Sequence, residues 1–412
     1  MIRSMFTAVN SLYNQQVFMD MVADNLSNVN TPGFKSSYIR FKDQFAQTMR
    51  MGSAPATTNN LGGTNPLQIG LGSNIGTVSQ VFSQGALQST GRELDLAISG
   101  DGFFVYRKGE TEYYSRDGSI AIDARGALVN SNTGEYIQGW QADGLGDINT
   151  GNPLTDIVVP VDSTTARPTE NATLQGNLDA NTADAGTFNV TFGTYDSLGV
   201  LKPVTVQFTR TANPVPAPVP LTTTWNWAAT SGGVGNGTLV FDANGRHISG
   251  GGDVSVTGSA GTNPTTCTIN MEGITMLSST NSVALTTQDG LAAGSLMGFN
   301  VSSNTGEVFG VFSNGDQHRI GQLAMALFIN PAGLTRQGNN QYLAGLNSGE
   351  PRIGQPSAGG RGTVASGYIE GSNVDMSREF SNMIMAQRGF QASSRIITTS
   401  DQMLQELVNL GR

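Results

Sequence analysis

The fold of this chain is decided by residues 376–404, which read MSREFSNMIMAQRGFQASSRIITTSDQML. A large apolar residue returns at every seventh position of this stretch, at Met376, Met383, Phe390, Ile397 and Leu404. An apolar period of 3.5 residues predicts a helix with a narrow seam, which another helix has to cover. The stretch therefore predicts a long C-terminal helix that functions in contact with a partner helix.

The other end of the chain carries the same spacing. A helix is expected from about Arg3 to Ser27, where the Asn, Pro and Gly of residues 28–33 stop it. Its predicted seam consists of Met5, Val9, Leu12, Met19, Ala23 and Leu26. The C-terminal helix is expected from the capping pair Ser372–Asn373 to about Leu410, and its seam also includes Phe380, Gln387 and Val408. We expect the two helices to pair and to contribute to contacts between subunits.

The sequence between the helices shows the period of two that is typical of strands. The clearest runs are 188–192, 204–208 and 323–327, in which apolar residues alternate with polar or small ones. The dipeptides Asn244–Gly245 and Asn314–Gly315 are typical of tight hairpin turns. The predicted fold is therefore multi-domain and mainly β, with the paired terminal helices forming a coiled-coil-like inner domain.

Composition suggests where the domains begin and end. Pro, Gly and Asn gather in two segments that we expect to be irregular linkers, and residues 213–220, with Pro at every second position, indicate an exposed loop. A polyproline recognition segment is the alternative for that loop. The expected parts are a helical domain of residues 1–50 and 366–412, linkers at 51–80 and 350–365, an inner β domain of 81–147 and 288–349, and an outer β domain of 148–287.

Charge and composition exclude several classes of partner. Charged residues make up only 13% of the chain, and the net charge of −9 comes without a basic patch. We therefore expect no nucleic-acid binding and no attraction to anionic membranes. No run of 18 apolar residues exists, so no membrane insertion is expected. Polar residues interrupt any secretory signal, and the lone Cys267 is expected to be a small buried residue.

The sequence offers no credible catalytic arrangement. Each of the two histidines, His247 and His318, follows a hairpin turn signal and is expected to be an exposed turn residue. The acids Asp95 and Asp101 belong to a stretch that indicates turn chemistry rather than a carboxylate pair. We therefore predict no catalytic residue, no cofactor, no metal site and no enzyme activity.

Two stretches near the ends resemble the signatures of a known family. The first spans residues 24–35, reads DNLSNVNTPGFK, and contains Asn25, Asn28, Asn30, Thr31, Gly33, Phe34 and Lys35. The second contains Asn373, Val374 and Asp375, followed by Gln387 and Arg388. These stretches resemble the N- and C-terminal signatures of the rod and hook axial proteins of bacterial flagella.

Within that family, the middle of the chain favours a hook subunit. Roughly 140 residues of β sequence lie between Trp140 and Gln288, whereas distal rod proteins are expected to be shorter. The resemblance implies a homopolymer that forms a curved, flexible tube, joins the rod to the filament and transmits motor torque. It also implies an extracellular place in the flagellum, reached without a cleaved signal peptide through the flagellar type III export apparatus. The implied partners are the rod, hook-cap, hook-length control and hook–filament junction proteins.

Two alternatives remain open at this point. One is a distal rod protein with an enlarged outer domain. The other is a secreted β-rich binding protein or hydrolase that oligomerises through its terminal coiled coils.

Overall fold

A computed structural model describes residues 2–54, 62–143, 146–161, 163–212, 221–259 and 262–410. The chain forms two compact units: the first comprises residues 1–159, 300–309 and 319–412, and the second residues 160–299 and 310–318. The proline-rich segment 213–220 lies outside the described residues. Among the described helices, none has the length and apolar character that a bilayer crossing requires.

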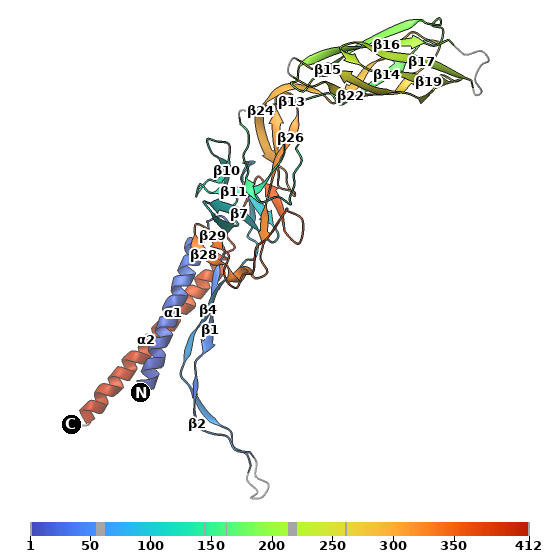
Figure 1. The fold of residues 1–412 in the computed structure, drawn as a ribbon. Helices are drawn as coiled ribbons and strands as arrows, with labels where there is room; N and C mark the ends of the chain where they lie inside the picture. Colours follow the sequence, from blue (N-terminus) through green and yellow to red (C-terminus); the bar gives the residue numbers. More distant parts are fainter. Residues whose placement is uncertain are drawn as a thin grey trace. The chain divides into compact units, whose positions relative to one another are not determined.

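The first unit contains both long helices, α1 (Ile2–Ser27) and α2 (Met376–Leu410). They run antiparallel, so that the two ends of the chain lie at the same end of the pair (Figure 1). α2 begins later than expected, because Asp375 Oδ1 accepts the backbone N–H groups of Ser377 and Arg378 at 2.9 and 3.2 Å. Asp375 is therefore the N-cap, and the predicted start at Ser372–Asn373 was wrong.

Residues 37–54 and 62–80 form antiparallel strand pairs, which we call the arm. β1 (Ser37–Asp43) pairs with β4 (Ser73–Gln80), and β2 (Ala46–Arg50) pairs with β3 (Leu67–Gly70). The sequence predicted that residues up to 50 belong to the helical domain and that 51–80 is irregular. Both expectations fail for these strands, because a ribbon with two exposed faces shows no alternation of apolar and polar residues.

The β body of the first unit is one sheet with side strands. Its central strands are β7 (Phe103–Lys108), β8 (Thr111–Ser115), β11 (Tyr136–Gln141), β28 (Thr335–Gly338) and β29 (Gln341–Leu343). Beside them lie β9 (Ile120–Ile122), β10 (Leu128–Asn130), β12 (Thr155–Asp156), β27 (Met325–Leu327) and β30 (Arg352–Gly354). Two small sheets pair β5 (Leu87–Ser89) with β32 (Tyr368–Glu370) and β6 (Leu96–Ser99) with β31 (Thr363–Ser366). A short 3₁₀ helix, η1, spans Pro331–Gly333.

Aromatic side chains fill the core of this β body. The ring of Phe103 lies edge-on to Phe328 and Tyr342, with centroids 5.8 and 6.0 Å apart. The run 323–327 was predicted to alternate, but Ala324 and Ala326 are as buried as their neighbours. The backbone there is covered on both sides. β30 and β31 likewise show that the predicted linker 350–365 is not wholly irregular.

The second unit is a sandwich of two five-stranded sheets. One sheet has the order β15 (Thr187–Tyr195), β16 (Leu201–Arg210), β17 (Thr222–Ser231), β19 (Asn236–Asp242) and β20 (His247–Ser249). The other has the order β18 (Gly233–Val234), β21 (Gly252–Val256), β22 (Thr265–Thr275), β14 (Asn171–Asn177) and β23 (Ala284–Gln288). β13 (Thr164–Arg167) pairs with β24 (Leu291–Val301), while β24, β25 (Glu307–Phe312) and β26 (Gln317–Leu323) pass from one unit to the other.

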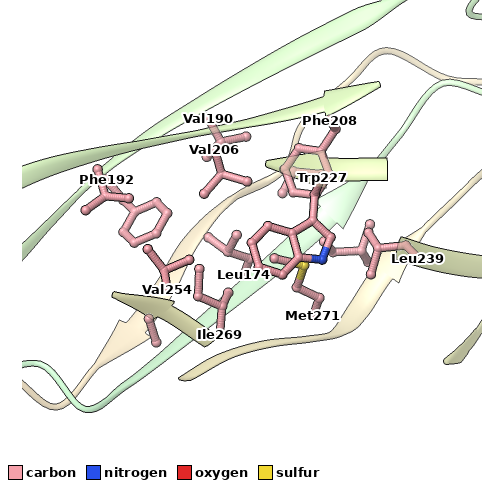
Figure 2. Packing of buried hydrophobic residues seen from close by; sticks show 14 of the residues in the cluster. Leu174, Val190, Phe192, Val206, Phe208, Trp227, Leu239, Val254, Ile269 and Met271 are labelled. Atoms are coloured by element: carbon pink, nitrogen blue, oxygen red, sulfur yellow. The ribbon is translucent and has the colours of Figure 1, made fainter. Parts of the chain in front are cut away.

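The core of the sandwich is built from both sheets. Figure 2 shows Trp227 among Val206, Phe208, Leu239 and Met271, all of them buried. The predicted alternation in 188–192 and 204–208 is confirmed, since the apolar side of each strand faces this core. The Asn–Gly pairs 244–245 and 314–315 connect β19 to β20 and β25 to β26, as hairpin turns would.

The single cysteine and the two histidines of the chain lie in strands of this unit. Cys267 is buried in β22, as expected, and its burial raises the pKa of the thiol to about 11. His247 and His318 lie half-buried in strands β20 and β26 rather than in exposed turns. The predicted fold class, mainly β with paired terminal helices, is confirmed.

Candidate assembly site

The helix pair is held by small and polar side chains. The buried residues of α2 are Glu379, Ala386, Ser393 and Ser400, which recur every seven positions. Ser393 Oγ lies 2.9 Å from Ser11 Oγ of α1. A Cβ built on Gly389 would lie only 2.8 Å from Gln15 Cδ, so the helices approach closely there. The seven-residue period was predicted correctly, but the residues at the centre of the contact are not those of the predicted seam.

None of the predicted seam residues is fully buried in the subunit. Half-buried are Met5, Leu12, Met19 and Leu26 of α1 and Met383, Ile397 and Leu404 of α2. Exposed are Val9 and Ala23 of α1 and Met376, Phe380, Gln387, Phe390 and Val408 of α2. The predicted seam was assigned to the heptad positions with the largest apolar residues. The structure instead places small residues inward, because they let the two backbones come close.

α1 is also fixed to the arm by buried asparagines. Asn14 Nδ2 donates to the backbone oxygen of Ser73 at 2.8 Å. Asn25 Nδ2 donates to the oxygen of Ser37 at 2.8 Å, and its Oδ1 accepts the N–H of the same residue at 2.9 Å. Asn25 thus replaces a strand partner for the first residue of β1. Its two bonds explain why an amide is needed at this motif position.

A buried cluster of charges joins the two ends of the chain. Lys35 Nζ lies 2.7 Å from Glu370 Oε1, and Arg116 approaches Glu370 Oε2 at 3.4 Å. All three side chains are almost completely buried. Burial lowers the pKa of both Lys35 and Arg116, and the nearby Glu370 carboxylate opposes that shift. Glu370 is therefore the shared counter-charge of two buried cations. Without it, both cations would be buried next to no carboxylate of this pair of contacts.

We call Gly33, Lys35, Arg116, Glu370 and Asn373 the junction. Hydrogen bonds to backbone groups add to its charged contacts. Gly33 N donates to the Glu370 backbone oxygen at 2.7 Å and has a positive φ of 70°. A Cβ at this glycine would meet Asp117 N at 2.7 Å, so a larger residue would clash. Asn373 Oδ1 accepts the N–H of Ser36 at 2.7 Å, and Asn373 Nδ2 donates to Val81 O at 2.7 Å.

The other motif residues have smaller roles. Asn28 Nδ2 donates to the Asp24 backbone oxygen at 2.9 Å and ends α1, while Thr31 Oγ1 bonds Asn28 Oδ1 at 3.2 Å. Phe34 is buried beneath the guanidinium of Arg336, 5.1 Å from its ring centre. The remaining motif residues are Val374, half-buried beside the cap, and Asn30, Gln387 and Arg388, which are exposed.

Sequence reasoning missed Arg116 and Glu370. Neither belongs to a quoted motif, and no local pattern indicates that residues 116 and 370 meet Lys35. The one available signal was Lys35 itself, since a lysine directly after Gly33–Phe34 at the end of a buried turn calls for a partner carboxylate. Among the described residues no group of His, Cys, Asp and Glu is arranged to hold a metal ion.

Comparison with known proteins agrees with this arrangement. Four family models match: "Flagella basal body rod protein" at residues 5–35, "Flagellar hook protein FlgE/F/G D1 domain" at 97–171, "Flagellar basal body protein FlaE D2 domain" at 160–291 and "Flagellar basal body rod FlgEFG protein C-terminal" at 365–410. A solved structure of the Helicobacter pylori flagellar hook protein FlgE2 matches with a TM-score of 0.50 and 14% identity. The match covers 69% of this chain and 100% of that chain, and at this identity it concerns the fold.

Curated relatives match over the whole chain. The flagellar hook protein FlgE of Borreliella burgdorferi is 36% identical, and the match covers 100% of both chains. The flagellar basal-body rod protein FlgG of Bacillus subtilis is 31% identical, and the match covers 100% of both chains. The chain belongs to the family of flagellar hook proteins, FlgE, which are structural subunits of the bacterial flagellar hook.

Proposed function

We propose that copies of this chain polymerise into a curved, flexible tube that joins the rod to the filament and transmits motor torque. The observation that carries the proposal is the uncovered apolar surface of α2. Phe380 is 47% exposed and Val408 is 68% exposed, although both belong to the predicted seam. Apolar side chains at these positions gain nothing within the subunit, so a neighbouring copy is the natural cover.

The surfaces on offer suit an open assembly. We propose that the exposed side of α2 meets a different face of the next copy rather than the same side of that copy's α2. Repeated contacts of that kind build a helical polymer when they do not close into a ring. The predicted seam residues thus keep their proposed role as subunit-interface residues, with the small residues of α2 serving the contact within the subunit.

Torque transmission requires that the helix pair stay attached to the β body. The junction supports this role, because the buried contact of Lys35 with Glu370 and the two strong bonds of Asn373 fix both chain segments that leave the helices. We propose that bending arises at contacts between copies and that the junction itself stays intact.

The other parts of the proposal rest on family membership. We propose rod, hook-cap, hook-length control and hook–filament junction proteins as partners, export through the flagellar type III apparatus to the outside of the cell, and a structural rather than enzymatic role. A chain that must pass an export channel unfolded benefits from having no internal disulfide, and Cys267 is its single cysteine.

Polymerisation of purified full-length chain tests the proposal. Phe380→Asp places a charge on the uncovered surface and should raise the concentration needed for polymer at least about tenfold. Thr399→Asp, at an exposed polar position of the same helix, is the matched control and should change it less than about threefold. Sedimentation measures the polymer, and circular dichroism checks that both variants keep their helices. Wild-type-like polymer from Phe380→Asp would refute the role of this surface.

A rod protein is the second candidate, and the match to the Bacillus subtilis rod protein is the observation that favours it. Electron microscopy of isolated hook–basal bodies, labelled with antibody against residues 150–287, separates the two. Label along the curved segment outside the cell supports the hook subunit. Label confined to the straight rod would replace that proposal by the rod alternative.

A further inference from the structure

The far part of the arm exposes more large apolar side chains than a two-stranded ribbon should. Phe45 is 88% exposed and Met51 is 82% exposed. Met49, Leu67 and Ile69 are also exposed. A lone two-stranded ribbon is only marginally stable in water, and an apolar surface of this kind marks a site of interaction. The arm therefore requires a cover that the subunit does not provide among its described residues.

The base of the arm is firmly attached to α1 and borders a groove. Asn14 bonds the start of β4, and Thr7 Oγ1 reaches the oxygen of Leu71 at 3.5 Å. Beside these contacts lies a groove of about 440 Å³ between the helix pair and β3. Its lining is apolar with one cation and includes Arg3, Thr7, Ala8, Ile69, Leu71 and Ile396. The groove continues the uncovered surface of the arm onto the helices.

The last turns of α2 form a second uncovered surface. The register set by Ser11 against Ser393 and by Gln15 against Gly389 brings the start of α1 opposite residues near 402. The residues after that point extend past the end of α1 and show an apolar stripe. Exposed there are Met403, Leu407, Val408 and Leu410. The spacing of Met403, Leu407 and Leu410 places these three along one side of the helix, with Val408 beside them.

The two surfaces carry opposite charge. The arm contains Arg40, Lys42 and Arg50 against a single acid, Asp43. Residues 396–410 of α2 contain Asp401 and Glu406 and no basic residue. The arm thus combines exposed apolar side chains with basic residues, and the end of α2 combines exposed apolar side chains with acidic residues. The two surfaces are complementary in charge. Opposite potentials of this kind set the register of an interface and exclude wrong partners.

We propose that the end of α2 in one copy, residues 401–410, packs on the arm of a second copy and covers the groove at its base. This inference rests on the proposed polymer and names the surfaces that would join its subunits. Within one subunit the end of α2 does not cover the arm, because the apolar side chains of both are exposed. The contact uses two different surfaces, so it propagates from copy to copy.

Cross-linking between single-cysteine chains tests the pairing directly. Full-length Met51→Cys and Leu407→Cys chains, each in a Cys267→Ala background, are mixed, polymerised and treated with a short bismaleimide. A covalent dimer should form in the mixture at least about tenfold above the yield from Ile248→Cys mixed with Leu407→Cys. Ile248 is a suitable control because it is 54% exposed but lies in the sandwich. A yield equal to the control overturns the proposal.

Charge reversal gives an independent reading. Arg50→Glu and Glu406→Arg should each raise the concentration needed for polymerisation about tenfold. The double variant that carries both substitutions should polymerise at close to the wild-type concentration. If the wild-type chain polymerises and neither reversal changes the threshold, this pairing is wrong while the proposed function stands. If the wild-type chain itself fails to polymerise, the proposed function is what has failed. Binding of an unrelated acidic helix as tightly as the second copy would also overturn the pairing.

Discussion

The sandwich of the second unit and the helix pair of the first bury very different side chains. The sandwich encloses Trp225, Trp227, Phe208 and Phe241 almost completely. The helix pair encloses Ala386 and serines, and leaves residues such as Phe380 and Leu410 uncovered. The first arrangement gains its stability within one chain. The second leaves large apolar groups exposed, and under the proposed assembly its full stability is expected only when other copies cover them.

The largest expected effect lies in the sandwich. Trp227→Ala removes a fully buried indole that packs between the two sheets and should lower the free energy of unfolding of this unit by about 4 kcal/mol. Tryptophan fluorescence during urea unfolding measures the loss, and Ile248→Ala, at an exposed position, should change it by less than about 0.5 kcal/mol. Equal loss of helix signal at the same urea concentration would show that the two regions do not unfold separately.

A somewhat smaller effect is expected at the junction. Glu370→Gln leaves Lys35 and Arg116 buried without their carboxylate and should cost about 3 kcal/mol of stability in the first unit. Glu110→Gln, which changes an exposed carboxylate in the same β body, is the control. Urea unfolding followed by circular dichroism measures both. An unchanged midpoint for Glu370→Gln would mean that the cluster does not hold the helix pair.

The buried thiol of the sandwich predicts a dependence on alkaline pH. Burial, with help from Asp289 and Asp253, raises the pKa of Cys267 from 9.0 to about 11. The folded state thus keeps a proton that the unfolded chain releases, so the stability from this thiol is complete below about pH 9 and is lost as pH rises to about 11. The rise of the pKa from 9.0 to about 11 corresponds to a total loss of about 2.7 kcal/mol. Urea unfolding between pH 8 and 10.5 should show a smaller decline for Cys267→Ala than for wild type, and parallel declines would contradict the assignment.

The smallest effect concerns the start of α2. Asp375→Ala removes the acceptor for the N–H groups of Ser377 and Arg378 and should cost about 1 kcal/mol. Ser377→Ala leaves the cap in place and serves as the control. Thermal unfolding of the helices measures the difference. Because the helix pair buries little apolar surface, this small loss should be easier to detect there than a similar loss in the sandwich.

Much of the fold was predictable because its signals are local. Alternation at 188–192 and 204–208 predicted strands with one covered face, and the Asn–Gly pairs predicted the turns. The seven-residue repeat predicted the helices. Its phase was not predictable from hydrophobicity, since the face that meets α1 is marked by the small residues Ala386 and Ser393.

The rest depended on contacts between distant parts of the chain. The arm was missed because strands exposed on both faces show no apolar period, and Gly and Pro nearby are typical of loops. The sequence singled out the motif residues Asn25, Lys35 and Asn373, but it did not indicate their partners. The pairing of Arg116 and Glu370 with Lys35 depends on three distant segments of the chain coming together.

The bond between Lys35 and Glu370 joins residues that are 335 positions apart. In a chain that emerges from its N-terminal end, all residues of the second unit, up to 318, come before the carboxylate that fixes the end of the first helix. Closing so long a loop is slow. Until it closes, Lys35 lacks its contact with Glu370. The order of the chain thus affects the order of folding: the helix pair, which we propose meets other copies, is the last part to be completed.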